Sequence, residues 1–387
     1  MAASIEDQLA ELRSRSLLRR LRTFDSAQQP EMEEGGKRLI SFASNDYLGL
    51  ATEPALKEAA KAAIDRYGVG SGAARLISGS LAPHAQLEDR IAHFKGTEAA
   101  LAFSSGYATA LGTLGALCGT EDVIILDKLS HASLIDGARL SRATVRVFPH
   151  NHLGKLESHL EWAAANHPDA RVIIVTEAVF SMDGDRAPLT EIVALKNRFG
   201  AMLLVDEAHA VGVLGRNGRG LADALRLEGE VDIQMGTLSK ALGVAGGYVA
   251  GSRRLVELLV NRARSFVYST APPPATAAAA GAAIEFMESD AGEERRKRLW
   301  ENLACFGGEM PQLFSDERKI QSAIVPLILG DAGRALEAAD RLAERGFYVP
   351  PIRHPTVPRD AARLRITLSA RHTPGQIAAL CAVLRSL

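Results

Sequence analysis

The fold is decided by the stretch Val231-Asp-Ile-Gln-Met-Gly-Thr-Leu-Ser-Lys240-Ala-Leu-Gly-Val-Ala-Gly-Gly247. Its apolar start is typical of a short buried strand, its Thr-x-x-Lys segment of a polar turn, and its end is rich in glycine. Small residues near Lys240 let a planar group approach the backbone, and Thr237 and Ser239 can hold an anion. An amine among neighbours of low polarity has a lowered pKa, which suits a lysine that condenses with a carbonyl. On this stretch alone, a solvated surface lysine stays open as the alternative.

A second stretch ends an apolar run with an acid: Ala201-Met-Leu-Leu-Val-Asp206-Glu-Ala-His209. Open α/β sheets bind ligands at the carboxyl ends of their strands, so Asp206 is predicted at such a site. Its anion there would keep a pyridine nitrogen protonated, and His209 could donate to a phenolic oxygen of the same ring. The letters Asp-Glu-Ala-His also occur in helicases, but the chain has no Gly-x-x-x-x-Gly-Lys-Ser/Thr phosphate loop. Together with Lys240, these residues point to pyridoxal phosphate.

The bulk properties are those of an ordinary globular protein. The 387 residues are 47% hydrophobic and 24% charged, with a formal net charge of −1. This length allows two or three domains, and the balanced charge predicts no binding to nucleic acid or anionic membranes. Cys118, Cys305 and Cys381 lack CxxC spacing, so neither a disulfide framework nor a metal site is expected. With no apolar run long enough to span a bilayer, we expect a cytoplasmic protein.

The first seventy residues combine helical and irregular patterns. Ile5 to Phe24 has helical periodicity with a basic face, which either is a solvated surface or serves an acidic substrate. A second helix is predicted from Glu53 to Tyr67. The following Gly68-Val-Gly-Ser-Gly-Ala fits a loose dinucleotide fingerprint, but a helix precedes it where that motif requires a strand.

From residue 99 onward, short apolar runs alternate with helical stretches. This alternation predicts βα units and an α/β fold with a mostly parallel sheet. The expected strands are Ala100–Phe103, Val123–Leu126, Val145–Phe148, Val172–Thr176, Met202–Val205, Ile233–Met235 and Tyr248–Ala250. After Ala271-Pro-Pro-Pro274, helices and two strands, near Ile324–Leu329 and Arg363–Leu368, predict a smaller α+β domain. We therefore expect an N-terminal helical arm (1–44), a large α/β domain (45–274) and a C-terminal α+β domain (275–387).

Three further strand ends carry polar groups. Phe103-Ser-Ser-Gly106-Tyr-Ala108 joins a strand to a helix, whose first N–H groups and dipole make an anion site. Glu177 to Asp185 follows another strand, and His131 follows a third, where it could stack on a ring or donate a proton. The carboxyl ends of several strands are expected to form one crevice.

Three motifs in this order and spacing give a resemblance: Asn45-Asp-Tyr-Leu-Gly, Asp206-Glu-Ala-His209 and Thr237-Leu-Ser-Lys240. The sequence resembles the α-oxoamine synthases, pyridoxal-phosphate enzymes of fold type I, over nearly its whole length. Arg264-Ser-Phe-Val-Tyr-Ser-Thr-Ala-Pro-Pro273 and Ile352-Arg-His-Pro-Thr-Val-Pro358 look like the family member that acts in biotin synthesis.

The resemblance implies roles around pyridoxal phosphate. Lys240, His131, His209 and Asp206 form the catalytic set, in which Lys240 carries the cofactor and Asp206 pairs with its ring nitrogen. The other cofactor-binding residues stack on the ring, line its polar edge or hold its phosphate. They are Gly106, Tyr107, His131, Glu177, Ser181, His209 and Thr237, with Ser269 and Thr270 supplied by the other subunit of a homodimer. No metal is implied.

The resemblance also implies a reaction, the decarboxylative condensation of L-alanine with a pimeloyl thioester of CoA or of an acyl-carrier protein. The implied substrate residues are Asn45 and Arg365 for the amino-acid carboxylate, His131 over the ring, and Arg19, Arg353 and Thr356 for the acyl substrate. His354 departs from the family pattern, in which proline is expected.

Three alternatives stay open. A sister synthase of the 2-amino-3-ketobutyrate ligase or 5-aminolevulinate synthase type would use glycine. A catalytically silent partner subunit would share the fold, although such subunits typically lack the lysine. A simple aminotransferase would transfer the amino group to a 2-oxo acid.

Overall fold

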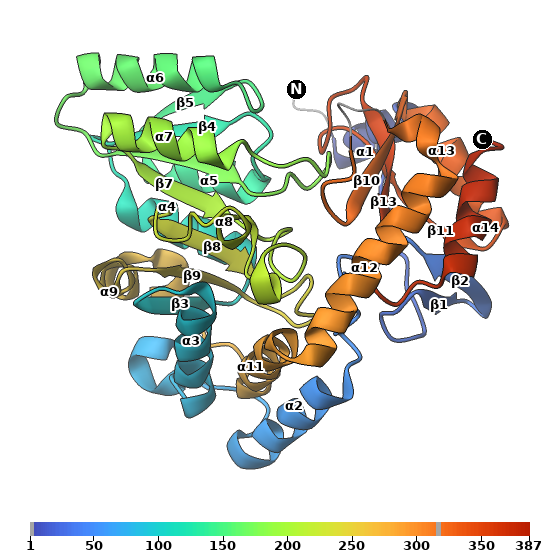
Figure 1. Ribbon diagram of the computed structural model, residues 1–387, viewed down its shortest axis with the longest axis horizontal. Coiled ribbons are helices and arrows are strands. Elements are labelled where there is room, and N and C mark those ends of the chain that lie inside the picture. Colours follow the sequence, from blue (N-terminus) through green and yellow to red (C-terminus); the bar gives the residue numbers. More distant parts are fainter. Residues whose placement is uncertain (1–3, 315–318) are drawn as a thin grey trace. The chain divides into compact units, whose positions relative to one another are not determined.

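The computed structural model describes residues 4–314 and 319–387, and its internal contacts divide the chain into two compact units (Figure 1). The large unit comprises Leu48–Ser181 and Asp185–Arg296. The terminal unit comprises the chain up to Tyr47, the short segment Met182–Gly184 and the chain from Lys297 onward. The domain boundaries expected at 44/45 and 274/275 stay a prediction.

The large unit is built on a seven-stranded sheet in the order β3-β9-β8-β7-β6-β4-β5. Its strands are β3 (Ala99–Phe103), β4 (Val123–Asp127), β5 (Thr144–Phe148), β6 (Val172–Glu177), β7 (Met202–Asp206), β8 (Ile233–Thr237) and β9 (Gly247–Gly251). β9 pairs antiparallel with both of its neighbours, while the pairs from β8 to β5 are parallel. The predicted α/β fold with a mostly parallel sheet is confirmed.

Helices alternate with these strands and cover the sheet, so the central strands are buried and are apolar up to the polar residues at their carboxyl ends. The helices of the large unit are α2 (Pro54–Tyr67), α3 (Ala82–Lys95), α4 (Gly106–Leu117), α5 (Ala132–Ser141), α6 (Leu153–Asn166), α7 (Leu189–Phe199), α8 (Leu221–Ala224), α9 (Arg253–Arg262), α10 (Arg264–Val267) and α11 (Pro274–Glu288). One core cluster joins β3, β4, β6, β8 and β9 to α4, α5 and α9, and includes Leu114, Leu134 and Leu259. The parallel connections bring the carboxyl ends of β4, β6, β7 and β8 to one edge.

The terminal unit contains two three-stranded sheets, in the orders β1-β2-β11 and β10-β13-β12. Its strands are β1 (Glu31–Glu34), β2 (Lys37–Ser41), β10 (Ile324–Gly330), β11 (Phe347–Tyr348), β12 (Pro351–Ile352) and β13 (Ala362–Thr367). Its helices are α1 (Ile5–Ser14), α13 (Ala332–Glu344) and α14 (Pro374–Leu384), and α12 (Asp290–Glu309) begins in the large unit. The two strands expected in this part of the chain are present as β10 and β13.

The helix expected from Ile5 to Phe24 is wrong in length, because α1 ends at Ser14. The N–H groups of Leu17 and Leu18 both donate to the carbonyl of Leu12, at 2.8 and 3.1 Å, and Ser16 has a left-handed φ of 55°. This is a C-terminal turn, and the helix before it buries none of its side chains. Periodicity without a buried face does not hold a longer helix together.

His372 is buried in the terminal unit, where its ring contacts residues from several segments of the chain. Its ring stacks on Phe42, with centroids 4.0 Å apart and an interplanar angle of 4°. Nδ1 accepts from the N–H of Ser369 at 2.9 Å, so the proton lies on Nε2, which donates to the carbonyl of Ser41 at 2.9 Å. Burial lowers the pKa of His372 to about 4, because the charged ring would lose its water.

This lowered pKa predicts acid destabilisation. The unfolded chain takes up the proton near pH 6.5, and the folded protein only near pH 4. The stabilisation by neutral His372 is therefore complete above about pH 6.5 and is lost as the pH falls toward 4, a change on the order of 3 kcal/mol. Urea unfolding should show this loss in the wild type and not in His372→Phe. His93→Gln, at an exposed histidine of α3, should keep the wild-type profile.

Candidate active site

A cavity of about 230 Å³ lies at the carboxyl edge of the large sheet. Its lining comes from the start of α4, the start of α5 and the ends of β6, β7 and β8. The predicted site residues in this lining are Gly106, Tyr107, His131, Glu177, Asp206, His209, Thr237 and Lys240. Ser105, Ser133, Ala208, Met235, Gly236 and Ser239 complete it. The structure therefore brings the lysine, the aspartate and both histidines to one cavity.

Lys240 lies on the turn that follows β8. The Thr237 hydroxyl donates to the carbonyl of Gly246 at 2.8 Å and lies 2.7 Å from the Ser239 hydroxyl. Gly243 closes the turn with a φ of 69°, and a Cβ there would lie 2.3 Å from the backbone nitrogen of Ala51. Only glycine fits this position, because both its backbone angle and its space exclude a side chain.

The amine of Lys240 lies 2.6 Å from Nε2 of His209, within hydrogen-bond distance. His209 is buried in the loop after β7, three residues beyond Asp206. An amine held by an imidazole has a fixed position and a neighbour that can exchange a proton with it. A nucleophile beside a base is one of the arrangements that covalent catalysis uses.

Asp206 ends β7, with its Oδ1 accepting from the N–H of Ala208 at 2.9 Å. Burial raises the pKa of Asp206, and the nearby positive charge of Lys240 only partly opposes this shift. The carboxyl group therefore holds a proton more strongly than a solvated aspartate. Such a group can share a proton with the nitrogen of a heterocyclic ring.

Glu177 and His131 are linked at the next strand end. Glu177 is paired with Asp206 in the register of β6 and β7, and its carboxylate accepts from the backbone N–H of His131. Burial raises the pKa of Glu177 well above its usual value, and the charge of Asp206 adds to the shift. The His131 ring contacts the Ser133 hydroxyl at 2.8 Å, and burial lowers its pKa. A neutral imidazole beside the cavity suits stacking on a ring.

The first turn of α4 is where the sequence predicts an anion site, and this stays a prediction. Ser105 caps the helix by accepting from the N–H of Ala108 at 3.1 Å, and the Tyr107 hydroxyl donates to Asp136 at 2.5 Å. A Cβ on Gly247 would lie 2.7 Å from the backbone of Gly106, so β9 and the helix start can only pack this closely without a side chain there. The first residues of this twelve-residue helix, Gly106 and Tyr107, line the cavity, and the N–H groups at the start of a helix suit a phosphate.

Three predicted cofactor residues lie outside this lining. Ser181 belongs to the loop after β6. Ser269 and Thr270 follow α10 and line a separate narrow cleft with Arg75 and Ser104. The roles of these three residues stay predictions. Ser269 and Thr270 were expected to bind the cofactor of the other subunit in a homodimer.

The predicted carboxylate-binding pair lies in the terminal unit. Arg365, on β13, is buried and donates through Nη1 to Asn45 Oδ1 at 3.0 Å and to Thr367 Oγ1 at 3.1 Å. The same oxygen of Asn45 accepts from the Tyr47 hydroxyl at 3.2 Å. The structure brings Asn45 and Arg365 together, although 320 residues separate them in the chain.

The residues expected to bind the acyl substrate also meet in the terminal unit. Arg19 donates to the carbonyl of His354 at 3.3 Å and to the Thr356 hydroxyl at 3.4 Å. Arg19, Arg20, Arg22 and Arg353 line a cavity of about 630 Å³, whose other walls are largely apolar. Burial and the charge of Arg19 lower the pKa of Arg353. Neighbouring arginines repel each other, so an anionic ligand would stabilise them.

One buried ion pair beside the cavity has no sequence signal. Lys95 of α3 binds Glu207, with side chains exposed by only 2% and 0%, and also donates to the carbonyl of Arg219. Glu207 accepts in addition from the N–H of Ala222 at 2.9 Å. Glu207 follows Asp206 directly, so the pair anchors the start of the loop that carries His209.

Breaking this pair should destabilise the protein strongly. Lys95→Met leaves the Glu207 carboxylate buried without its cation, and we expect the free energy of unfolding to fall by about 3–5 kcal/mol. The measurement is chemical denaturation followed by circular dichroism. Lys61→Met, which breaks the exposed Lys61–Glu58 pair, should change it by less than about 1 kcal/mol. Equal effects of the two substitutions would contradict the argument.

The described residues show neither a metal-binding cluster nor a membrane-spanning helix. Residues 4–314 and 319–387 contain no group of three or more histidine, cysteine, aspartate or glutamate side chains placed to hold a metal ion. Over the same ranges, none of the helices combines the length and the apolar character needed to cross a membrane.

Comparison with known proteins identifies the family. Residues 37–384 match the family described as aminotransferase class I and II. An 8-amino-7-oxononanoate synthase of Geobacter sulfurreducens is 49% identical over 373 residues, covering 96% of this chain and 94% of the relative. The synthase of the same name from Anaeromyxobacter dehalogenans is 49% identical over 384 residues, covering 98% and 95%. A solved structure of a serine palmitoyltransferase variant from S. paucimobilis is also similar, with a TM-score of 0.90 and 32% sequence identity. The match covers 98% of this chain and 96% of that one, which has a pyridoxal phosphate–myriocin aldimine bound. The chain therefore belongs to the family of class I and II aminotransferases.

Proposed function

We propose that the protein is a pyridoxal-phosphate enzyme that condenses L-alanine with a pimeloyl thioester to 8-amino-7-oxononanoate, carbon dioxide and a free thiol. The observation that carries this proposal is the Lys240–His209 pair, 2.6 Å apart in a cavity that Asp206 also lines. The 49% identity with a synthase of that name over nearly the full length supports the choice of reaction. The product places the enzyme in biotin biosynthesis.

The cavity fits the cofactor. Lys240 supplies the amine for its aldehyde, and Asp206 supplies a carboxyl group of raised pKa for its ring nitrogen. His131 supplies an uncharged ring for stacking, and the first turn of α4 at Gly106 supplies N–H groups for its phosphate. When bound, pyridoxal phosphate supplies an electron sink that stabilises negative charge on the α-carbon of an amino acid.

The residues of the cavity perform the proton transfers. Lys240 would hold the cofactor, and as a free amine it would remove the α-proton of alanine. His209 holds the Lys240 amine in position for this step and can accept or return its proton. Asp206 would hold the cofactor's ring nitrogen and would favour its protonated form, in which the ring is the stronger electron sink. The α-carbon then attacks the thioester carbonyl, the thiol leaves, and loss of carbon dioxide and reprotonation complete the reaction.

The terminal unit would bind the substrates. We assign the alanine carboxylate to Arg365 and Asn45, because a buried guanidinium and an amide are joined there at 3.0 Å. The acyl substrate is assigned to Arg19, Arg353 and Thr356. The arginine-lined cavity with apolar walls suits a chain that ends in a carboxylate.

The proposal includes a homodimer in the cytoplasm. Ser269 and Thr270 line a cleft apart from the Lys240 cavity, which is compatible with their reaching the phosphate of a second copy. The three cysteines are free, as a reducing compartment favours. The mass of the protein in dilute solution and complementation between inactive Lys240 and Ser269 variants test the shared site.

Product identification tests the reaction. Purified protein is supplied with pyridoxal phosphate and each pairing of L-alanine, glycine or L-serine with pimeloyl-CoA or palmitoyl-CoA, and the products are identified by mass spectrometry. Serine and palmitoyl-CoA are included because the structural neighbour is a serine palmitoyltransferase. We expect 8-amino-7-oxononanoate from alanine and pimeloyl-CoA. A product from glycine or serine alone, or amino transfer to a 2-oxo acid, would refute the assignment, and pimeloyl-acyl-carrier protein is compared in a second series.

A further inference from the structure

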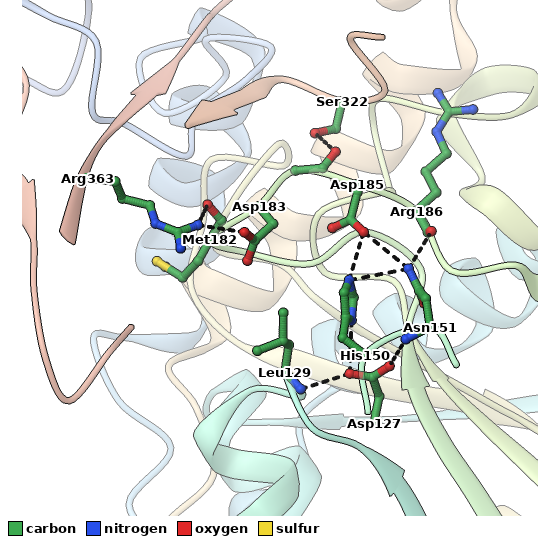
Figure 2. Close-up of polar contacts among 11 residues, drawn as sticks. Asp127, Leu129, His150, Asn151, Met182, Asp183, Asp185, Arg186, Ser322 and Arg363 are labelled. Atoms are coloured by element: carbon green, nitrogen blue, oxygen red, sulfur yellow. Dashed lines mark hydrogen bonds and ion pairs between the residues drawn. The ribbon is translucent and has the colours of Figure 1, made fainter. Parts of the chain in front are cut away.

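His150 lies between two carboxylates at the carboxyl edge of the large sheet (Figure 2). Its Nδ1 is 3.0 Å from Asp127 Oδ1, and its Nε2 is 2.8 Å from Asp185 Oδ2. Asp127 ends β4 and is fully buried, whereas Asp185 belongs to the loop after β6. The Phe180 ring packs edge-on against the imidazole, with centroids 4.3 Å apart.

Two carboxylates that face the two ring nitrogens favour a protonated ring. An ionised carboxylate only accepts hydrogen bonds, so each ring nitrogen must carry a proton to bind its partner. A neutral imidazole has one N–H and could satisfy only one of the two carboxylates. Burial lowers the pKa of His150, but the hydrogen bonds with Asp127 and Asp185 outweigh it and raise the pKa to about 10.

Asp127 organises the turn that leads to His131. Its Oδ1 also accepts from the N–H of Leu129 at 2.8 Å, and its backbone carbonyl accepts from the N–H of Ser130 at 3.1 Å. The next residue is His131, whose N–H donates to Glu177. The carboxylate that His150 neutralises therefore fixes the turn that delivers His131 to the cavity.

Asp185 organises the hairpin that follows Glu177. Within the hairpin, the N–H of Phe180 donates to the carbonyl of Asp185 at 3.0 Å, and that of Ala187 to the carbonyl of Ala178 at 3.3 Å. The Asn151 side chain donates to the same Asp185 oxygen as His150, at 3.1 Å, and to the carbonyl of Arg186 at 3.2 Å. His150 and Asn151 thus hold the returning strand of the hairpin, whose outgoing strand starts directly after Glu177.

We propose that His150 is a positioning residue of the active site, a cation that ties the turn before His131 to the hairpin after Glu177 and so keeps both cavity residues in place. His150 touches neither cofactor nor substrate in this scheme and acts through Asp127 and Asp185. The proposal rests on the proposed function only in taking the Lys240 cavity as the cofactor site.

The arrangement predicts a loss of order at alkaline pH. The charged groups that face His150 are Asp127 from β4 and Asp185 from the hairpin, while its other neighbours, Phe180 and Asn151, are uncharged. As the pH rises through about 10, the ring loses one proton and releases one carboxylate. The turn before His131 or the hairpin then loosens.

The first test needs no cofactor. In protein labelled with ¹⁵N at the histidine rings, both ring nitrogens of His150 should carry protons at pH 8. A single protonated nitrogen would overturn the proposal. In His150→Gln, hydrogen exchange at the N–H groups of Leu129 and Phe180 should be faster by about tenfold or more. His159→Gln, at a histidine on the surface of α6, should leave both rates unchanged.

The second test uses the holoenzyme. Asp185→Asn keeps the size of the side chain and removes one charge, so the pKa of His150 should fall. The visible circular dichroism of the bound cofactor, which reports how His131 lies on the ring, should change at a lower pH than in the wild type. His150→Gln with Asp185→Asn should recover part of the wild-type signal, because the double substitution relieves the repulsion between the carboxylates. An unchanged alkaline transition in Asp185→Asn would contradict the proposal. If both ring nitrogens of His150 are protonated as expected but the wild type gives no cofactor signal, only the proposed function is contradicted.

Discussion

Replacing Lys240 with alanine should lower turnover by at least about 10⁴-fold and abolish covalent attachment of the cofactor. The residue would serve twice, as the amine that binds the aldehyde and as the base that takes the α-proton. Alanine retains neither function, and His209 would lose the partner that lies 2.6 Å from its Nε2. Other residues of the cavity could still hold the cofactor non-covalently.

The measurement is borohydride reduction followed by peptide mapping. In the wild type, the cofactor should be found on the peptide containing Lys240, and in Lys240→Ala on no peptide. Lys128→Ala is the matched control, because Lys128 is an exposed lysine on the turn that leads to His131. Modification of another lysine in the wild type, or normal turnover of Lys240→Ala, would exclude the assigned role.

Asp206→Asn should lower kcat/KM by roughly 10²–10³-fold, the usual loss when a preorganised charge is removed from an active site. The amide can still accept from the N–H of Ala208, so the loop should keep its conformation. It cannot stabilise a proton on the ring nitrogen, so the electron sink weakens. The cofactor should still attach to Lys240, which separates this defect from loss of binding.

Steady-state kinetics and the absorbance of the bound cofactor are measured on the same preparation. Asp122→Asn is the control, because Asp122 accepts from the N–H of Gly119 at 2.8 Å at the opposite end of β4. That variant should keep kcat/KM within about threefold of the wild type, since surface changes away from the site have small effects. A comparable kinetic loss in both variants would point to a general disturbance of the sheet.

The sheet and the centre of the site were predictable because one rule governs both. Parallel strands separated by helices place their carboxyl ends together, so a lysine after β8 and an aspartate at the end of β7 must lie close to each other. Asn45 and Arg365 could not be paired in this way. Asn45 lies in a loop and Arg365 on a small antiparallel sheet, far apart in sequence, and only the family resemblance connected them.

Other features had no local signal. The partners of Lys95 and His150 come from distant segments, and neither side chain stands in a motif that differs from a solvated one. The prediction of a helix from Ile5 to Phe24 was wrong for a related reason. Helical periodicity shows which residues could share a face, but it does not show whether another element packs on that face. The positions of Ser269 and Thr270 concern a second copy of the chain, about which one sequence gives no geometric information.

The terminal unit is assembled from segments that are far apart in the chain, and this constrains the order in which the protein folds during synthesis. One of its two sheets joins β2 to β11, and its residues come from the segment up to Tyr47, from Met182–Gly184 and from the segment that starts at Lys297. On the ribosome, the first segment emerges long before its partners are translated, whereas the large unit has all its residues once Arg296 has left the exit tunnel. Nascent chains stalled soon after that point should protect the seven-stranded sheet from protease and leave the leading segment cleavable. Chaperone demand should therefore concentrate on the segment before Leu48 while the segment from Lys297 onward is still being synthesised.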